Sequence, residues 1–172
     1  MMSEQFNLDN AIQASLANFT KQIDQMSSDK FNEMRKCSFF DPIPSDWLKE
    51  IAKDAQIVTF TSGREIINGS NTKGDFYVIL FGSATAYVNQ TAVGTIRSGE
   101  CLGESTFFPD KSITRTATVM ADSEVIAVEI PKSAVTQFEG SLKMYIDKAL
   151  LLALYNKLQR ANLKIDQLLH NN

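Results

Sequence analysis

The chain has 172 residues and a formal net charge of -3 at pH 7, and 44% of its residues are hydrophobic and 22% charged. This composition is typical of one globular domain with a sizeable core, to which helical appendages are added. The acidic balance argues against a surface that tracks phosphate chains, because nonspecific nucleic-acid binding needs a basic face that releases counterions. A single local anion site is compatible with it.

Apolar residues near the N-terminus recur every three or four positions, at Leu8, Ile12, Leu16, Phe19, Ile23 and Met26. This stripe predicts an amphipathic helix that serves core or dimer packing, or else docks a partner. A second short helix is expected from Phe31 to Cys37. Ser45 is expected to cap a third helix, because its hydroxyl can accept a hydrogen bond from a free backbone amide.

The middle of the chain, from about 56 to 130, consists of short β-branched-rich segments such as IVTF, DFYVILFG and EVIAVEI. Gly, Asn, Asp and Ser separate these segments, as they do in antiparallel sheets. We therefore expect an α+β fold, in which an antiparallel β jelly roll or barrel follows N-terminal helices and precedes a long C-terminal helix.

The C-terminal segment has neither Gly nor Pro from Leu142 to Leu169, which predicts one long helix. Six of its apolar residues alternate at spacings of three and four, at Leu151, Leu154, Leu158, Ala161, Ile165 and Leu168. This set, called the seam below, favours a homodimer over the alternative that the helix only packs on its own barrel.

Three parts follow along the chain: an N-terminal helical extension over 1–36, a β-barrel domain with flanking helices over 37–140, and a dimerisation or lid helix over 141–172. We expect the Lys and Glu residues scattered on the helices to be ordinary solvated residues.

No catalytic constellation and no metal-binding motif stand out. The only cysteines are Cys37 and Cys101, without ligand spacing, and the only histidine is His170 in the tail. The N-terminus is polar and acidic, and the longest apolar run, ALLLALY, is too short to cross a bilayer. We expect a soluble cytoplasmic protein that is not an enzyme, with no metal, no cofactor and no membrane partner.

One turn-rich segment, GECLGESTFFPDKSITRTATV, combines the parts of an anion site. Gly103 permits a close backbone approach, and the residues after it can wind one helical turn with free amides. The guanidinium of Arg115 matches two oxygens of a phosphate. Glu104 is then expected to accept a hydrogen bond from a sugar hydroxyl.

The span from Gln56 to Ile130 resembles a cyclic nucleotide-binding domain, of the kind in the bacterial catabolite-activator family and in cyclic-nucleotide-dependent kinases. The resemblance is carried by the ordered pairs Gly99-Glu100 and Gly103-Glu104, followed by RTATV, which are similar to that family's phosphate-binding cassette.

The resemblance implies roles for individual residues. Arg115 pairs with the cyclic phosphate, Glu104 accepts from the ribose 2′-hydroxyl, and Gly103 with the backbone of Ser105 and Thr106 cradles phosphate and sugar.

Two further contacts follow from the resemblance. Thr116 is placed to hydrogen-bond phosphate or base. Asn162 on the closing helix is placed to reach a purine edge, although we favour the interpretation that Asn162 is a solvated helix residue.

The sequence thus predicts a stand-alone sensor for a cyclic mononucleotide, with cyclic AMP favoured over cyclic GMP, that signals to a protein partner through its helices. We expect no DNA binding, because the chain ends at Asn172, soon after the seam. The alternative is a degenerate fold that has lost its ligand and serves as an interaction scaffold.

Overall fold

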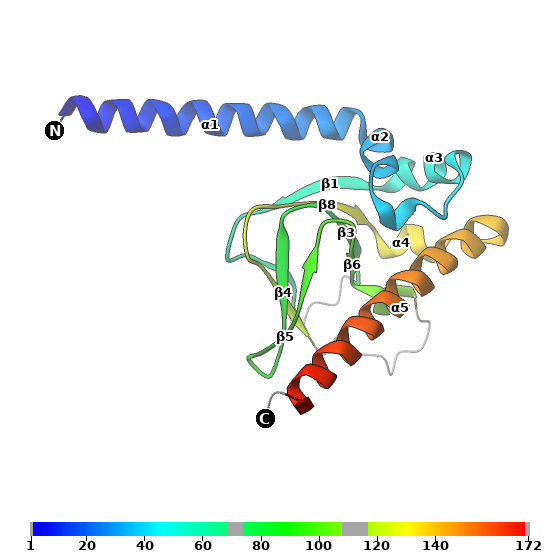
Figure 1. The fold of residues 1–172 in the computed structure, drawn as a ribbon. Coiled ribbons are helices and arrows are strands. Elements are labelled where there is room, and N and C mark those ends of the chain that lie inside the picture. Colours follow the sequence, from blue (N-terminus) through cyan, green and yellow to red (C-terminus); the bar gives the residue numbers. More distant parts are fainter. Residues whose placement is uncertain (1, 69–73, 108–116, 171–172) are drawn as a thin grey trace.

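The computed structural model describes residues 2–68, 74–107 and 117–170, without the side chains of 2–9 and 106. Two antiparallel sheets are flanked by helices at both chain ends (Figure 1). The helices are α1 Met2–Ser28, α2 Lys30–Arg35, η1 Ser38–Phe40, α3 Ser45–Asp54, η2 Glu104–Phe107, α4 Lys132–Val135 and α5 Gly140–His170. The strands are β1 Gln56–Phe60, β2 Glu65–Ile67, β3 Phe76–Phe81, β4 Ser83–Val88, β5 Thr91–Arg97, β6 Cys101–Leu102, β7 Thr118–Ala121 and β8 Val125–Ile130.

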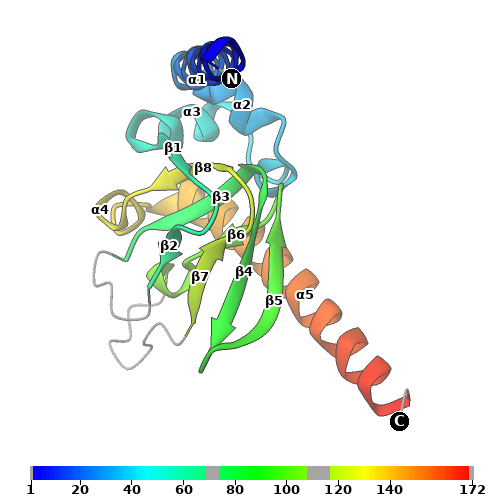
Figure 2. The ribbon, with the colours of Figure 1, turned by 90° about the vertical axis from the view of Figure 1, so that its left-hand side faces the viewer.

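The two sheets have the strand orders β1-β8-β3-β6 and β2-β7-β4-β5, and every pair within them is antiparallel. Figure 2 shows the second sheet in face view, with α1 end-on above the sandwich. This arrangement confirms the predicted α+β fold: N-terminal helices, an antiparallel β-sandwich and a long C-terminal helix.

Strand β3 explains why the central segments are almost continuously apolar. Its residues alternate between two cores: Phe76 and Val78 belong to the cluster under the helices, whereas Tyr77 and Ile79 face the interior of the sandwich. Because both faces of β3 are covered from Phe76 to Ile79, polar residues have no solvated side to occupy there. Strand β3 therefore separates a helical core from a sandwich core.

The β4–β5 hairpin forms one wall of the pocket described below. Its two turn residues, Asn89 and Gln90, both have positive φ, at 47° and 65°, which matches the right-handed twist of the two strands. The pairing shifts by one residue between Ala86 and Tyr87, because Ala86 pairs with Gly94 while Tyr87 pairs with Ala92. The extra residue, Val93, is half exposed at the pocket.

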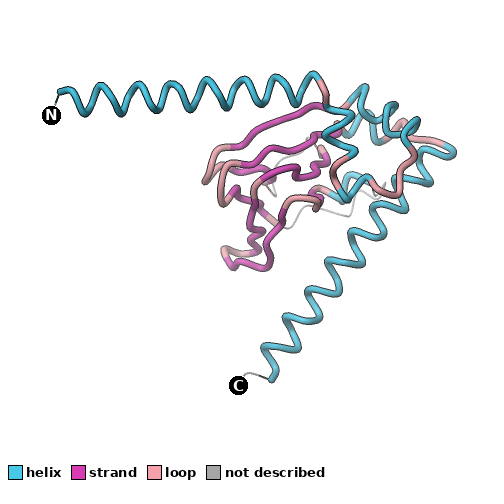
Figure 3. Tube along the Cα trace, turned by 45° about the horizontal axis from the view of Figure 1, so that its top comes forward, coloured by secondary structure: helices cyan, strands magenta, loops and turns pink. Residues whose placement is uncertain are grey.

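The N-terminal helices differ in how much they bury. Helix α3 packs Leu48 and Ile51 fully into the core. Its N-cap is Pro44, and Ser45 is the first helical residue, so the expected cap by Ser45 is wrong. Helix α1 projects away from the sandwich (Figure 3), and Ile12 and Leu16 of its predicted stripe are exposed.

Helix α5 begins in the core and ends in solvent. Ile146, Ala149 and Leu150 are buried near its start, and beyond them the helix runs along the sandwich (Figures 1 and 2). Across the described ranges, α5 and the other helices all lack a stretch long and apolar enough to span a membrane.

The seam residues do not all lie on one outward face. Leu154 packs against the helical core, and Ala161 lines a pocket beside the sandwich. The remaining four are exposed, with 55–68% of each residue accessible to solvent: Leu151, Leu158, Ile165 and Leu168. The helix therefore does pack on its own sandwich, and it also leaves an apolar face uncovered.

Candidate functional site

The segment that the sequence singled out begins on a buried strand. Strand β6 pairs with β3, where Leu102 lies opposite Tyr77 and Cys101 opposite Val78. Gly103 follows with φ of 86°, a left-handed conformation that glycine adopts without steric cost. The chain then turns directly into η2, so Glu104 and Ser105 project from the end of a fixed strand.

A pocket of about 610 Å³ lies between this segment, the β4–β5 hairpin and α5. Most of its sandwich wall is formed by small or apolar residues, including Ile67, Ala86, Val93 and Val119. Its polar lining comes from three places, the segment after β6, one face of α5 and strand β5: Gly103, Glu104 and Ser105, then Lys157, Arg160 and Lys164, and Thr95 and Arg97.

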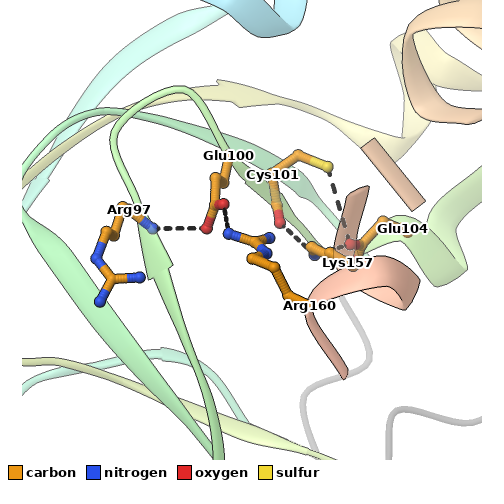
Figure 4. A network of polar contacts seen from close by, with 6 residues as sticks. All are labelled: Arg97, Glu100, Cys101, Glu104, Lys157 and Arg160. Carbon is orange, nitrogen blue, oxygen red and sulfur yellow. Dashed lines mark hydrogen bonds and ion pairs between the residues drawn. The ribbon is translucent and has the colours of Figure 1, made fainter. Parts of the chain in front are cut away.

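The carboxylate of Glu104 is paired with a lysine of α5. The ammonium of Lys157 donates to Oε1 of Glu104 and also to the backbone oxygen of Cys101, at 2.6 Å. Both side chains are mostly covered, with 19% of Glu104 and 29% of Lys157 exposed. Lys157 therefore ties α5 to the segment at two points (Figure 4).

A second ion pair lies one helical turn further along α5. Arg160 donates to Oε1 of Glu100, and Oε2 of Glu100 accepts the backbone N–H of Arg97 at 2.9 Å. Glu100 thus bridges the end of β5 and the helix, as Figure 4 shows. The glutamate of each Gly-Glu pair thus forms an ion pair with α5: Glu104 with Lys157, and Glu100 with Arg160.

The thiol of Cys101 completes this network. Its Sγ donates to Oε1 of Glu104 at 3.8 Å, and the residue is fully buried. The pKa of Cys101 is raised to about 12, chiefly by burial and also by the Glu104 carboxylate, while the Lys157 ammonium opposes both. The thiol remains protonated at neutral pH, so it is a weak donor and a poor nucleophile.

Three predicted site residues meet at this pocket: Gly103, Glu104 and Ser105. Thr106 lies in η2, but its side chain is not described. Arg115 and Thr116 lie outside the described residues. Asn162 is exposed on α5 and is not among the pocket-lining residues, so its contact with a base stays a prediction.

The pocket also contains residues that the sequence analysis did not assign to it. Lys157 was expected to be an ordinary solvated charge, and its ion pair with Glu104 shows that this expectation is wrong. Arg160, which the sequence analysis did not assign, pairs with Glu100. The available signal was their spacing. Lys157 follows the buried positions Ile146, Ala149 and Leu150 at helical intervals, so it continues the face that packs on the sandwich.

Residues 57–140 match the family model described as "Cyclic nucleotide-binding domain". A cGMP-dependent protein kinase from Plasmodium berghei is 24% identical over 132 residues, which are 74% of this chain. The chain spans only 15% of the length of that kinase.

Solved structures share the fold at low sequence identity. A putative cyclic nucleotide-binding protein from Geobacter metallireducens superposes with a TM-score of 0.66 at 21% identity, covering 74% of this chain and 96% of that one. The regulatory subunit of a cAMP-independent protein kinase A from Trypanosoma brucei gives a TM-score of 0.65 at 15% identity, covering 84% of this chain and 50% of that one.

Proposed function

We propose a function from the premise that residues 57–140 form a domain of the cyclic nucleotide-binding family: the chain is a sensor that binds a cyclic mononucleotide in the pocket between β6, η2 and α5. The observation that supports this most is the convergence of Gly103, Glu104 and Ser105 on one wall of a 610 Å³ pocket. A concave, largely apolar site with a few directed polar groups is what a small ligand requires.

Each residue that we expect to bind such a ligand matches one part of it. Glu104 accepts the ribose 2′-hydroxyl, while Gly103 and the backbone of Ser105 lie against sugar and phosphate. Arg115 and Thr116 keep the roles expected from the sequence, pairing with the phosphate and hydrogen-bonding phosphate or base. The fold does not select the base, since its relatives include a cGMP-dependent and a cAMP-independent kinase.

Titration calorimetry with cyclic AMP and cyclic GMP tests this proposal. We expect binding of at least one of them, with cyclic AMP the stronger, and its loss in Arg115→Leu, because a guanidinium paired with phosphate contributes charge-assisted hydrogen bonds. The matched control is Arg64→Leu, which removes one positive charge from an exposed position that does not line the pocket. Equal affinity in wild type and Arg115→Leu contradicts the assignment.

We further propose that α5 carries the signal and joins two copies of the chain. A nucleotide shifts a conformational equilibrium only if it prefers one helix arrangement, and α5 lines the pocket while exposing apolar residues on another face. The exposed seam residues Leu158 and Ile165 suit a parallel pairing of two helices. A downstream protein partner then reads the arrangement.

Sedimentation velocity tests the homodimer. We expect Leu158→Asp to dissociate it, because a carboxylate has no partner in an apolar seam. Leu163→Asp is the control, since Leu163 is 62% exposed on the same helix and lies outside the seam, whereas Leu158 is 58% exposed. A wild-type monomer at high concentration, with and without nucleotide, rules the homodimer out.

One observation favours a second function, an interaction scaffold without a ligand. Glu104 and Glu100 already have cations of the same chain as partners, as in a site that no longer needs a ligand. A thermal-shift screen separates the two functions, because a ligand of the native state raises the melting temperature. No shift with cyclic AMP, cyclic GMP or a cyclic dinucleotide favours the scaffold.

A further inference from the structure

The contact between α5 and the segment after β6 uses the same carboxylate that the proposed ligand needs. Oε1 of Glu104 accepts from the ammonium of Lys157 and from the thiol of Cys101. The ammonium therefore already uses acceptor capacity of the oxygen that a hydroxyl donor would need. It is also held in place by its second bond, to the backbone oxygen of Cys101.

We propose that Lys157 is an internal occupant of the sugar site, and that Lys157 and Arg160 together form a latch that the nucleotide opens. This inference rests on the proposed function, and it identifies how the same site is regulated. A ribose 2′-hydroxyl and the Lys157 ammonium are both hydrogen-bond donors to Glu104. In this proposal the 2′-hydroxyl replaces the ammonium at Oε1 of Glu104, and the displaced helix turn loses its attachment to β6.

Through Arg160, the latch also depends on the contact between Glu100 and the end of β5. Both oxygens of Glu100 are engaged, one by the guanidinium of Arg160 and the other by the backbone N–H of Arg97. Because Lys157 and Arg160 are three residues apart, one helical turn carries both ion pairs. Moving that turn far enough to free Glu104 also strains or breaks the pair with Glu100.

The residues on the sandwich-facing side of α5 support a reversible attachment of its distal part. Up to Leu154 the sandwich-facing residues of α5 are apolar, whereas from Lys157 onward three of the four residues that line the pocket are cations, and two of them pair with carboxylates. An apolar contact would hold the helix whether or not a ligand were present. An ion pair with the ligand-binding carboxylate makes helix docking depend on the ligand.

The decisive experiment compares Lys157→Met with Lys164→Met. Lys164 lines the same pocket, and within the described part of the chain it forms no ion pair with Glu100 or Glu104. Each variant removes one positive charge near an anionic ligand, so the general electrostatic effect is matched. Calorimetry uses two probes, cyclic AMP and its 2′-deoxy analogue, which lacks the hydroxyl that competes for Glu104.

We expect Lys157→Met to bind cyclic AMP roughly fivefold more tightly than Lys164→Met, as for the loss of a modest competing ion pair. For the 2′-deoxy analogue the two variants should agree within about twofold. Weaker binding of cyclic AMP by Lys157→Met than by Lys164→Met overturns the proposal, because Lys157 would then be a ligand-binding residue itself.

A second measurement needs no nucleotide and keeps the latch testable if the proposed function fails. Hydrogen exchange should be faster in residues 157–170 of the Lys157→Met, Arg160→Met double variant than in wild type, and unchanged in residues 143–152. Unchanged exchange in both segments rejects the latch. Absence of cyclic AMP binding in wild type and in Lys157→Met, combined with faster exchange, rejects the ligand but retains the latch.

Discussion

The two halves of α5 contact the same sandwich through different kinds of interaction. In the proximal half, from 140 to 154, Ile146 is fully buried, Leu150 is buried, and Leu154 packs against the same core. In the distal half, from 155 to 170, the inward contacts are the ion pairs of Lys157 and Arg160. One continuous helix is thus anchored at one end and attached by charges at the other.

Under the proposed latch, this difference lets a small ligand act on a long helix. We expect the apolar burial in the proximal half to be the same whether the pocket is empty or filled, so in this proposal that half is a fixed anchor. The distal contacts use Glu100 and Glu104 beside the pocket, so their strength depends on what occupies it. Three of the four exposed seam residues, Leu158, Ile165 and Leu168, lie on this distal half, and Leu151 lies on the proximal half.

The largest expected effect comes from weakening the anchor. Ile146→Ala should lower the free energy of unfolding by about 2–5 kcal/mol, because truncation of a fully buried side chain leaves a cavity. Leu163→Ala in the distal half should change it by less than about 0.5 kcal/mol, because Leu163 is exposed. Urea denaturation measures both, and similar losses in the two variants would contradict the division of α5.

We expect an effect of intermediate size on stability from Cys101, which lies on β6 and contacts α5 near the point where its two halves meet. Its thiol has a pKa of about 12 in the folded protein, against 9.0 ordinarily, chiefly because it is buried. The unfolded thiol ionises first, so the stability that the buried thiol contributes is complete below pH 9 and is lost as the pH rises toward 12.

Between pH 8 and pH 10 this loss amounts to about 1.4 kcal/mol, one pKa unit's worth of free energy. We expect wild type to lose about that much more unfolding free energy over this range than Cys101→Ala, which has no thiol to ionise. The measurement is urea denaturation at both pH values. Parallel pH profiles in the two proteins would mean that water reaches Cys101.

Much of the fold could be predicted from the sequence because it depends on local patterns. The period of apolar residues changes from helical to extended near Gln56 and back after Pro131, and these changes coincide with real boundaries. The segment around Gly103 and Glu104 was also recognisable, because its spacing is set by one turn of backbone. The cap at Ser45 was misplaced by one residue, since Pro44 fits the position before a helix equally well.

The ion pairs of α5 could not be predicted in the same way. A helical period identifies a face, but it does not say what that face meets, and Lys157 lies 53 residues after Glu104 in the chain. The same limit affected the seam, in which Leu154 and Ala161 share spacing with Leu158 but face the core or the pocket. Only the path of α5 across the sandwich resolves these assignments.

The smallest expected effect separates the halves of α5 by their response to salt. Raising the ionic strength from about 0.1 M to about 1 M shortens the Debye length from about 10 Å to about 3 Å, which weakens partly exposed ion pairs and slightly strengthens apolar burial. Amides of residues 157–170 should therefore exchange about two- to threefold faster at high salt, while those of 143–152 do not. In the Lys157→Met, Arg160→Met double variant the difference should vanish, because no attachment remains for salt to weaken. If the distal half of wild type were instead insensitive to salt, packing rather than charge would hold it, and α5 would be a single rigid element with one kind of contact.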